Sequence, residues 1–315
     1  MTCPPTVAGA DPVFRCAHNG PRRRPATVLV MLAACSVALA GCSPGRVHPL
    51  PAPSVVTASA PQHSAGLRPT RVATRRPTPV AVPPPATSAP AAPRLAGALI
   101  VLDPGHNPGN SSYPDEVNRM VNAVTEWKPC DTSGTATDSG YPEADFTYDV
   151  ALRAAALLEA DGARVVLTRT AATPWGPCIT ERAAIANRLH AAVALSIHAD
   201  GGPASGYGFH VITPADVGVN HSIIAASARL GLVLHRVFHA ETGEPFATYI
   251  GDGSGLVQRS DLGGLNLSLV PKVFIECGNM RNAWDAGRLE SPGYRETVAA
   301  AIADALAAYL RGAST

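Results

Sequence analysis

Four residues of this 315-residue chain have the types needed for metal-assisted hydrolysis: two histidines and two glutamates, far apart in the sequence. Two imidazoles and one carboxylate, with a fourth position left for water, form a recurring ligand set for catalytic zinc. A further carboxylate beside such a site can act as general base and then as general acid. A single histidine at a strand end is more often structural, so the zinc hypothesis rests on the whole set. The four residues are His106, Glu143, His198 and Glu276.

The hydrophobic pattern places each of these residues at the end of a predicted element. Buried strands are predicted just before His106, just before His198 and up to Glu276, from the apolar runs ALIVLD, AVALSI and KVFIE. Glu143 opens a stretch with apolar residues at three- and four-residue steps, which predicts an amphipathic helix over 143–160. In an open α/β sheet, ligands bind outside the carboxyl ends of the strands. We therefore expect the four side chains to meet at one edge of the sheet.

The same alternation of patterns indicates the fold class. Short β-branched runs alternate with longer helical patterns after residue 94, which predicts an α/β fold with a twisted, mostly parallel sheet and helices on both faces. We expect a single catalytic domain over residues 95–315, long enough to bury a substantial core. The remaining predicted strands are 163–168 and 206–212, and the remaining predicted helices are 179–190, 222–243 and 293–310.

The residues before this domain have a different composition. Three arginines at 22–24 precede the apolar stretch VLVMLAACSVALAGC, which is too short to span a bilayer comfortably and predicts a signal peptide over residues 1–42. Its last residues, LAGC, resemble a bacterial lipobox, in which Cys42 is lipidated; an ordinary secretory signal cleaved nearby is the alternative. Residues 43–94 are rich in Pro, Ala, Ser and Thr and predict a disordered linker. The expected product is an exported protein, lipid-anchored on Cys42 at the outer face of the cytoplasmic membrane, in the periplasm or cell wall.

The cysteine positions and the net charge further restrict the kind of protein that this chain can be. Cys130 and Cys178 stand in turn-like sequence of an exported domain, so we predict that they form a disulfide. Cys277 lies in an apolar run and is expected to be a buried, inert thiol. The net charge is +1 with both signs interspersed, so no basic face indicates nucleic acid binding.

A family resemblance covers residues 95–310. The motifs IVLDPGHNPG, YPEADFTYDV, SIHADGG, GFHVI and KVFIECGNM resemble those of the zinc-dependent N-acetylmuramoyl-L-alanine amidases, the amidase-3 family, and HADGGPASGYGFHV most resembles its mycobacterial periplasmic members. The resemblance implies that His106, Glu143 and His198 bind Zn²⁺ and that Glu276 is the catalytic glutamate. Periodicity alone leaves Asp145 and Asp149 open as alternatives to Glu143, and only the motif selects among them.

The implied reaction is hydrolysis of the amide between the lactyl group of N-acetylmuramic acid and L-alanine, in peptidoglycan or its muropeptide fragments. Zinc in such a site lowers the pKa of a bound water towards ~7, and Glu276 would take the water proton and return it to the departing amine. We expect the protein to act as a monomer. One alternative is a zinc peptidase that cuts the peptide stem. Another is a non-catalytic lipoprotein that binds wall fragments or metal, which the presence of Glu276 disfavours.

Several neighbours of the predicted site leave alternatives open. Gly105 is expected to permit the sharp turn that aims His106, and Asp103 either orients this loop or simply caps a turn. Asp200 stands where many family members have Asn, so it either tunes the site or bonds a loop. The long polar segment 107–142 either covers the site or is a surface excursion. The sequence gives no partner for His210.

Overall fold

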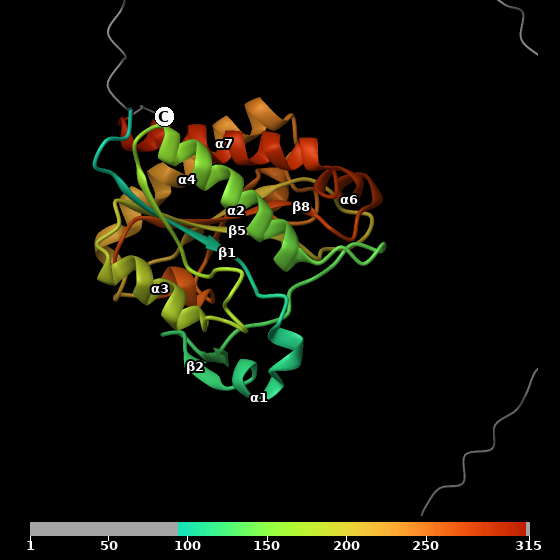
Figure 1. The fold of residues 1–315 in the computed structure, drawn as a ribbon, viewed down its shortest axis with the longest axis horizontal. Coiled ribbons are helices and arrows are strands. Elements are labelled where there is room, and N and C mark those ends of the chain that lie inside the picture. The colour runs from blue at the N-terminus through green and yellow to red at the C-terminus, as the bar shows by residue number, and fades with distance from the viewer. Residues whose placement is uncertain (1–93, 313–315) are drawn as a thin grey trace, which may run out of the picture. The chain divides into compact units, whose positions relative to one another are not determined.

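The computed structural model describes residues 94–312, which form a single α/β domain around a six-stranded sheet of order β4-β1-β5-β8-β6-β7 (Figure 1). The predictions on residues 1–42, including Cys42, and on residues 43–93 lie outside the described residues. Four neighbouring strands are parallel, and the last two run in the opposite direction. The parallel strands are β4 (Arg164–Leu167), β1 (Leu99–Pro104), β5 (Val193–Asp200) and β8 (Lys272–Asn279), and the other two are β6 (His210–Pro214) and β7 (Leu256–Arg259). The predicted mostly parallel sheet is therefore confirmed.

Helices cover both faces of this sheet, as the strand composition requires. One face packs against α2 (Glu143–Ala160), α4 (Ile224–Thr242) and α7 (Pro292–Leu310), which lie together above the sheet in Figure 1. Alternate residues of β5 and β8 enter this main core, among them Leu195, Ile197 and Ile275. The intervening residues face α3 (Ile179–Arg188) and α5 (Gly263–Asn266) on the other side, and this second face carries the polar groups discussed below.

The segment 107–142 is less irregular than its sequence indicates. It contains η1 (Asn110–Ser112), α1 (Pro114–Val117) and an antiparallel hairpin of β2 (Met120–Asn122) and β3 (Trp127–Pro129). Directly after β3, Cys130 is joined to Cys178 at the N-cap of α3, which confirms the predicted disulfide. The remaining short elements are η2 (His221–Ile223), η3 (Gly251–Gly253) and α6 (Ala283–Leu289).

Helix α4 with η2, His221–Thr242, is long and apolar enough to cross a membrane, which by itself is weak evidence for a membrane span. Its apolar face lies on the sheet, where Leu230, Leu234 and Phe238 are completely buried. Gly243 ends the helix in the left-handed conformation (φ 64°), a common helix terminator. Packing in the core of the domain therefore accounts for the apolar composition of this helix.

Candidate metal centre and active site

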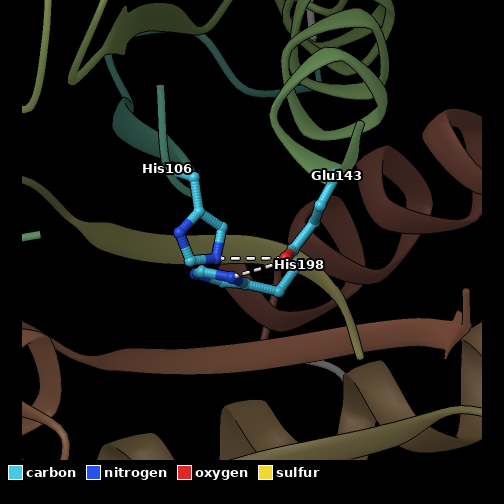
Figure 2. A group of neighbouring side chains, drawn as sticks. All are labelled: His106, Glu143 and His198. Atoms are coloured by element: carbon cyan, nitrogen blue, oxygen red, sulfur yellow. Dashed lines mark hydrogen bonds and ion pairs between the residues drawn. The ribbon is translucent and has the colours of Figure 1, made fainter. Parts of the chain in front are cut away.

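Three of the predicted side chains converge at the carboxyl end of the sheet. Figure 2 shows His106, Glu143 and His198 pointing toward one another from three different elements. His106 follows β1, Glu143 is the first residue of α2, and His198 lies near the end of β5. Each offers a ligand atom, and these atoms all lie within 4.8 Å of one another. The structure thus brings together residues that are 37 and 55 positions apart in the chain.

The spacing of the donor atoms suits a small tetrahedral cation. Glu143 bridges the two imidazoles: its Oε2 lies 3.2 Å from His106 Nε2, and its Oε1 lies 3.0 Å from His198 Nδ1. Ligands at ~2.0–2.1 Å from a tetrahedral Zn²⁺ stand ~3.3 Å from one another. The two rings meet nearly edge to face, with centroids 4.9 Å apart and an interplanar angle of 89°. Two imidazole nitrogens and a carboxylate that lies close to both of them form a donor set that fits zinc.

Contacts behind the ligands fix their orientation. The Nδ1 of His106 lies 3.0 Å from the carbonyl oxygen of Thr132, so this nitrogen donates and Nε2 keeps its lone pair directed at the centre. Backbone N–H groups of Thr135 and Ala199 donate to the two oxygens of Glu143, at 3.0 and 3.2 Å. His198 stacks on Phe274 of β8, with ring centroids 5.2 Å apart. Contacts within the protein therefore hold all three candidate ligand side chains in place.

The turn that aims His106 differs from the sequence expectation. His106 itself has the left-handed backbone conformation (φ 58°), whereas Gly105 does not. Gly105 is needed for space instead, because a Cβ at this position would stand 2.2 Å from Cε1 of His198. The carbonyl of His106 accepts a hydrogen bond from Nη2 of Arg182 at 2.9 Å, which supports the unusual backbone.

Electrostatics hold Glu143 ionised. Burial alone would raise the pKa of Glu143, but the two imidazoles outweigh it and keep this pKa well below its usual range. Burial likewise opposes protonation of His106, yet the Glu143 carboxylate, Asp131 and the Thr132 carbonyl raise the pKa of the imidazole. The carboxylate and the imidazole therefore each favour the charged form of the other.

Glu276 stands on the strand next to His198. It is the register partner of His198 across β5 and β8, and it shares a sheet face with Phe274. Burial, together with the carboxylates of Glu143 and Asp200, raises the pKa of Glu276 well above its usual range, while Arg259 opposes this. A carboxyl group with a raised pKa beside a metal site is suited to carry a proton. Cys277, the next residue, points into the main core and is a buried free thiol, as expected.

Known proteins that are similar to this chain belong to one family. The family model described as N-acetylmuramoyl-L-alanine amidase matches residues 100–308. The N-acetylmuramoyl-L-alanine amidase Rv3717 of Mycobacterium tuberculosis is 41% identical over 229 residues, which cover 72% of this chain and 92% of that protein. The chain belongs to the N-acetylmuramoyl-L-alanine amidase family.

Solved structures of related amidases share the fold. The amidase Ami1 of Mycobacterium smegmatis is 43% identical with a TM-score of 0.65, over 69% of this chain and 99% of that one. The apo form of Ami1 from Mycobacterium abscessus is also 43% identical, with a TM-score of 0.62, over 68% of this chain and 99% of that one. The amidase domain described here accordingly spans almost the full length of both.

A buried ionic network beneath the metal centre escaped the sequence reasoning, except for Asp103. The Asp103 carboxylate of this amidase accepts from Lys272 Nζ at 3.0 Å and from Arg182 Nη1 at 2.9 Å, and these two cations hold its pKa well below the usual range against the effect of burial. Arg182 also donates to Asp131 at 2.9 Å. It thus links the loop of His106 to the segment after β3. The sequence signal for this network is Arg182, because a charged residue on the buried face of the predicted helix 179–190 needs a partner in the interior.

A cavity of about 200 Å³ adjoins the metal centre of the amidase. Lys128 and Pro129 of the hairpin line one side of it, and Phe274, the loop before α5 and the first two residues of that helix (261–264) line another. The hairpin is fastened to that loop, because Lys128 Nζ donates to the carbonyl of Asp261 at 2.8 Å. Segment 107–142 therefore borders the space beside the candidate metal ligands and is more than a surface excursion; that it covers the site stays a prediction.

Proposed function

We propose that this amidase uses Zn²⁺, held by His106, Glu143 and His198, to hydrolyse the amide between the lactyl group of N-acetylmuramic acid and L-alanine in peptidoglycan or muropeptides. The observation that carries the proposal is the convergence of the three donor atoms, with Glu276 on the adjacent strand. Membership of the family supplies the bond that is cut. The ligand types, two imidazoles and one carboxylate, support zinc as the metal.

The residues of the chain divide the work between them. Zinc, when bound, would lower the pKa of a water molecule to about 7 and polarise the scissile carbonyl. Glu276 accepts the water proton as the oxygen forms its bond to the carbonyl carbon. When the C–N bond breaks, Glu276 returns that proton to the departing nitrogen of L-alanine. An amine anion is a poor leaving group, so this second transfer is as necessary as the first.

The products discriminate this reaction from the alternatives. Purified protein incubated with muropeptides should release the intact stem peptide and the free sugar, detected by mass spectrometry, and a chelator should abolish release until Zn²⁺ is restored. Cleavage within the stem would instead establish a peptidase. Binding of muropeptides without any cleavage in the presence of Zn²⁺ would establish a non-catalytic binder and overturn the proposal.

The role of Glu276 has its own test. Glu276→Gln keeps the size of the side chain but cannot accept a proton, so kcat should fall by about 10²- to 10⁴-fold while one Zn²⁺ per chain is retained. Glu159→Gln, on the exposed side of α2, is the matched control and should behave as wild type. A Glu276→Gln protein with zinc and full activity would contradict the assignment.

We also propose that the enzyme is exported and anchored by a lipid on Cys42, acting as a monomer on the cell wall. The signal-like residues 1–42 and their LAGC ending support this, together with the disulfide of the catalytic domain. The Pro-rich residues 43–94 would lift the domain off the membrane. Metabolic labelling with palmitate should mark the wild-type protein and not Cys42→Ser; equal labelling of both would refute the anchor.

A further inference from the structure

A row of three polar side chains crosses the face of the sheet that carries the candidate metal centre. His198 on β5 is in register with Glu276 on β8, and Glu276 is in turn in register with His210 on β6. Directly opposed residues of an antiparallel pair have Cβ atoms about 4.5–5.5 Å apart. His210 is therefore an immediate neighbour of the proposed proton carrier, on the side away from the metal ligands.

His210 is buried, and one of its ring nitrogens has no hydrogen-bond partner among the described residues. Only 1% of its surface is exposed, and its Nδ1 is a buried atom without a hydrogen-bond partner among the described residues. Burial lowers the pKa of His210 to about 4, with Arg259 adding to the effect and Asp200 opposing it. The imidazole is thus neutral at physiological pH and carries one N–H donor. Buried polar atoms without a partner are rare and concentrate at sites with a function.

Tyr249 presents a second such atom at the same place. Its ring lies 6.1 Å from that of His210, at an angle of 85°, and its hydroxyl is buried without a partner among the described residues. Burial and the nearby carboxylates of Asp200 and Glu276 raise the pKa of the phenol, so it stays protonated. The hydroxyl is therefore a donor that faces two carboxylates.

Two glycines hold the Tyr249 ring in this position. A Cβ on Gly202 would stand 2.7 Å from Cε2 of Tyr249, and a Cβ on Gly206 would stand 2.6 Å from its Cδ1. The loop that follows β5 thus comes into direct contact with the ring through backbone atoms alone. A cradle of this kind fixes a side chain to a degree that a solvent-exposed tyrosine would not require.

We propose that His210 and Tyr249, whose buried polar atoms have no partner among the described residues, donate hydrogen bonds to Glu276 in the zinc-loaded enzyme and act as positioning residues that keep its carboxylate aimed at the reacting water. The inference rests on the proposed function, because it assigns Glu276 the proton transfers described above. Glu276 is surrounded by Glu143 of α2, Asp200 of β5 and Arg259 of β7. Because the carboxylates of Glu143 and Asp200 repel an ionised Glu276, neutral hydrogen-bond donors would hold it in one orientation.

The test uses the zinc-loaded enzyme with a soluble muropeptide as substrate. Tyr249→Phe and His210→Phe each remove one donor and keep an aromatic ring, and kcat should fall about tenfold with KM within about twofold of wild type, since orientation and not binding is lost. His210→Gln keeps an N–H donor and should recover most of the loss. Zinc affinity and the melting temperature should stay close to wild type in all three variants.

Matched controls separate orientation from general damage. His221→Phe changes an exposed histidine, and Tyr309→Phe changes a tyrosine of α7 on the other face of the sheet; both should leave kcat unchanged. Should His210→Phe fail to fold, Tyr249→Phe decides the matter alone. The inference is overturned if both variants keep kcat within about twofold of an active wild type, or if kcat, zinc affinity and melting temperature fall together without rescue by His210→Gln. An inactive wild type would instead overturn the proposed function.

Discussion

At the scale of single residues, the metal centre depends as much on a missing side chain as on those present. Gly105 lies under the His198 ring, and a Cβ there would meet Cε1 at 2.2 Å and Nδ1 at 2.5 Å. The backbone of Gly105 is not left-handed, so alanine can adopt the same main-chain conformation. The close contacts of its Cβ would be with the His198 ring. The position therefore isolates the effect of ring placement.

Gly105→Ala should accordingly displace His198 and weaken metal binding. We expect zinc affinity to fall by on the order of 10- to 100-fold, the range seen when the surroundings of a metal ligand are altered. Isothermal titration with Zn²⁺ measures this directly. Gly287→Ala in α6, where no heavy atom lies within 4 Å of the added Cβ, is the control and should bind zinc as wild type does. Equal zinc affinity in Gly105→Ala and Gly287→Ala would show that the His198 ring moves aside at no cost to metal binding.

At the scale of elements, the segment directly after the hairpin of β2 and β3 is connected to the rest of the domain by a disulfide and by a hydrogen bond to His106. The disulfide joins Cys130 to Cys178 across 48 positions, and the Thr132 carbonyl that accepts from His106 follows two residues after Cys130. Closing a loop of this length stabilises the folded state by about 4 kcal/mol in the chain-entropy estimate. We therefore expect the covalent link to contribute both to the stability of the fold and to the orientation of His106.

Replacing both cysteines by serine should lower the free energy of unfolding by about 2–4 kcal/mol and should also weaken zinc binding. Urea denaturation and a zinc titration measure the two effects. Cys277→Ala leaves the disulfide intact and should keep zinc affinity, although it loses some core packing. Should the double variant bind zinc as tightly as wild type, the hairpin would have no part in holding His106.

The elements that the sequence predicts well are those with long periodic patterns. The helix over 143–160, the strand that precedes His106 and the strands that carry His198 and Glu276 follow from hydrophobic spacing. Strand β6 begins at His210 and not at residue 206, because Gly208 is left-handed (φ 96°). The hairpin and β7 were missed, since three or four residues carry too short a pattern to recognise. The partners of Glu276 were missed for another reason: pairing across β8 and β6 depends on register, which composition does not reveal.

At the scale of the whole molecule, a buried pair of acids joins several elements behind the active site. Glu244, just beyond α4, and Asp285 of α6 are each only 1% exposed. Asp285 Oδ2 accepts from the N–H groups of Gly208 and Asn279, both at 2.8 Å, while Glu244 Oε2 accepts from Tyr294 of α7 at 2.6 Å. The pair thus links the entry to β6, the end of β8 and helices α6 and α7.

The protonation of this pair should make the stability of the domain depend on pH. Burial raises the pKa of Glu244 from 4.5 to about 7; the Tyr294 hydroxyl and the Arg288 guanidinium, 3.0 Å away, oppose the shift, and the Asp285 carboxyl adds to it. The folded state therefore holds this proton more tightly than the unfolded state does. Its stabilising effect is complete below pH 4.5 and is lost as the pH rises through 7, by at most about 3 kcal/mol.

Glu244→Gln should remove most of this dependence. The amide cannot ionise and can still donate toward Asp285, so the variant should lose less free energy of unfolding than wild type between pH 4.5 and pH 8. Urea denaturation across that range gives both curves, and their difference isolates Glu244 from the histidines that titrate in the same interval. Glu159→Gln, exposed on α2, should follow the wild-type curve. Parallel curves for Glu244→Gln and wild type would mean that the pair holds no proton above pH 4.5, and the packing of α6 and α7 against the sheet would then be independent of pH in this range.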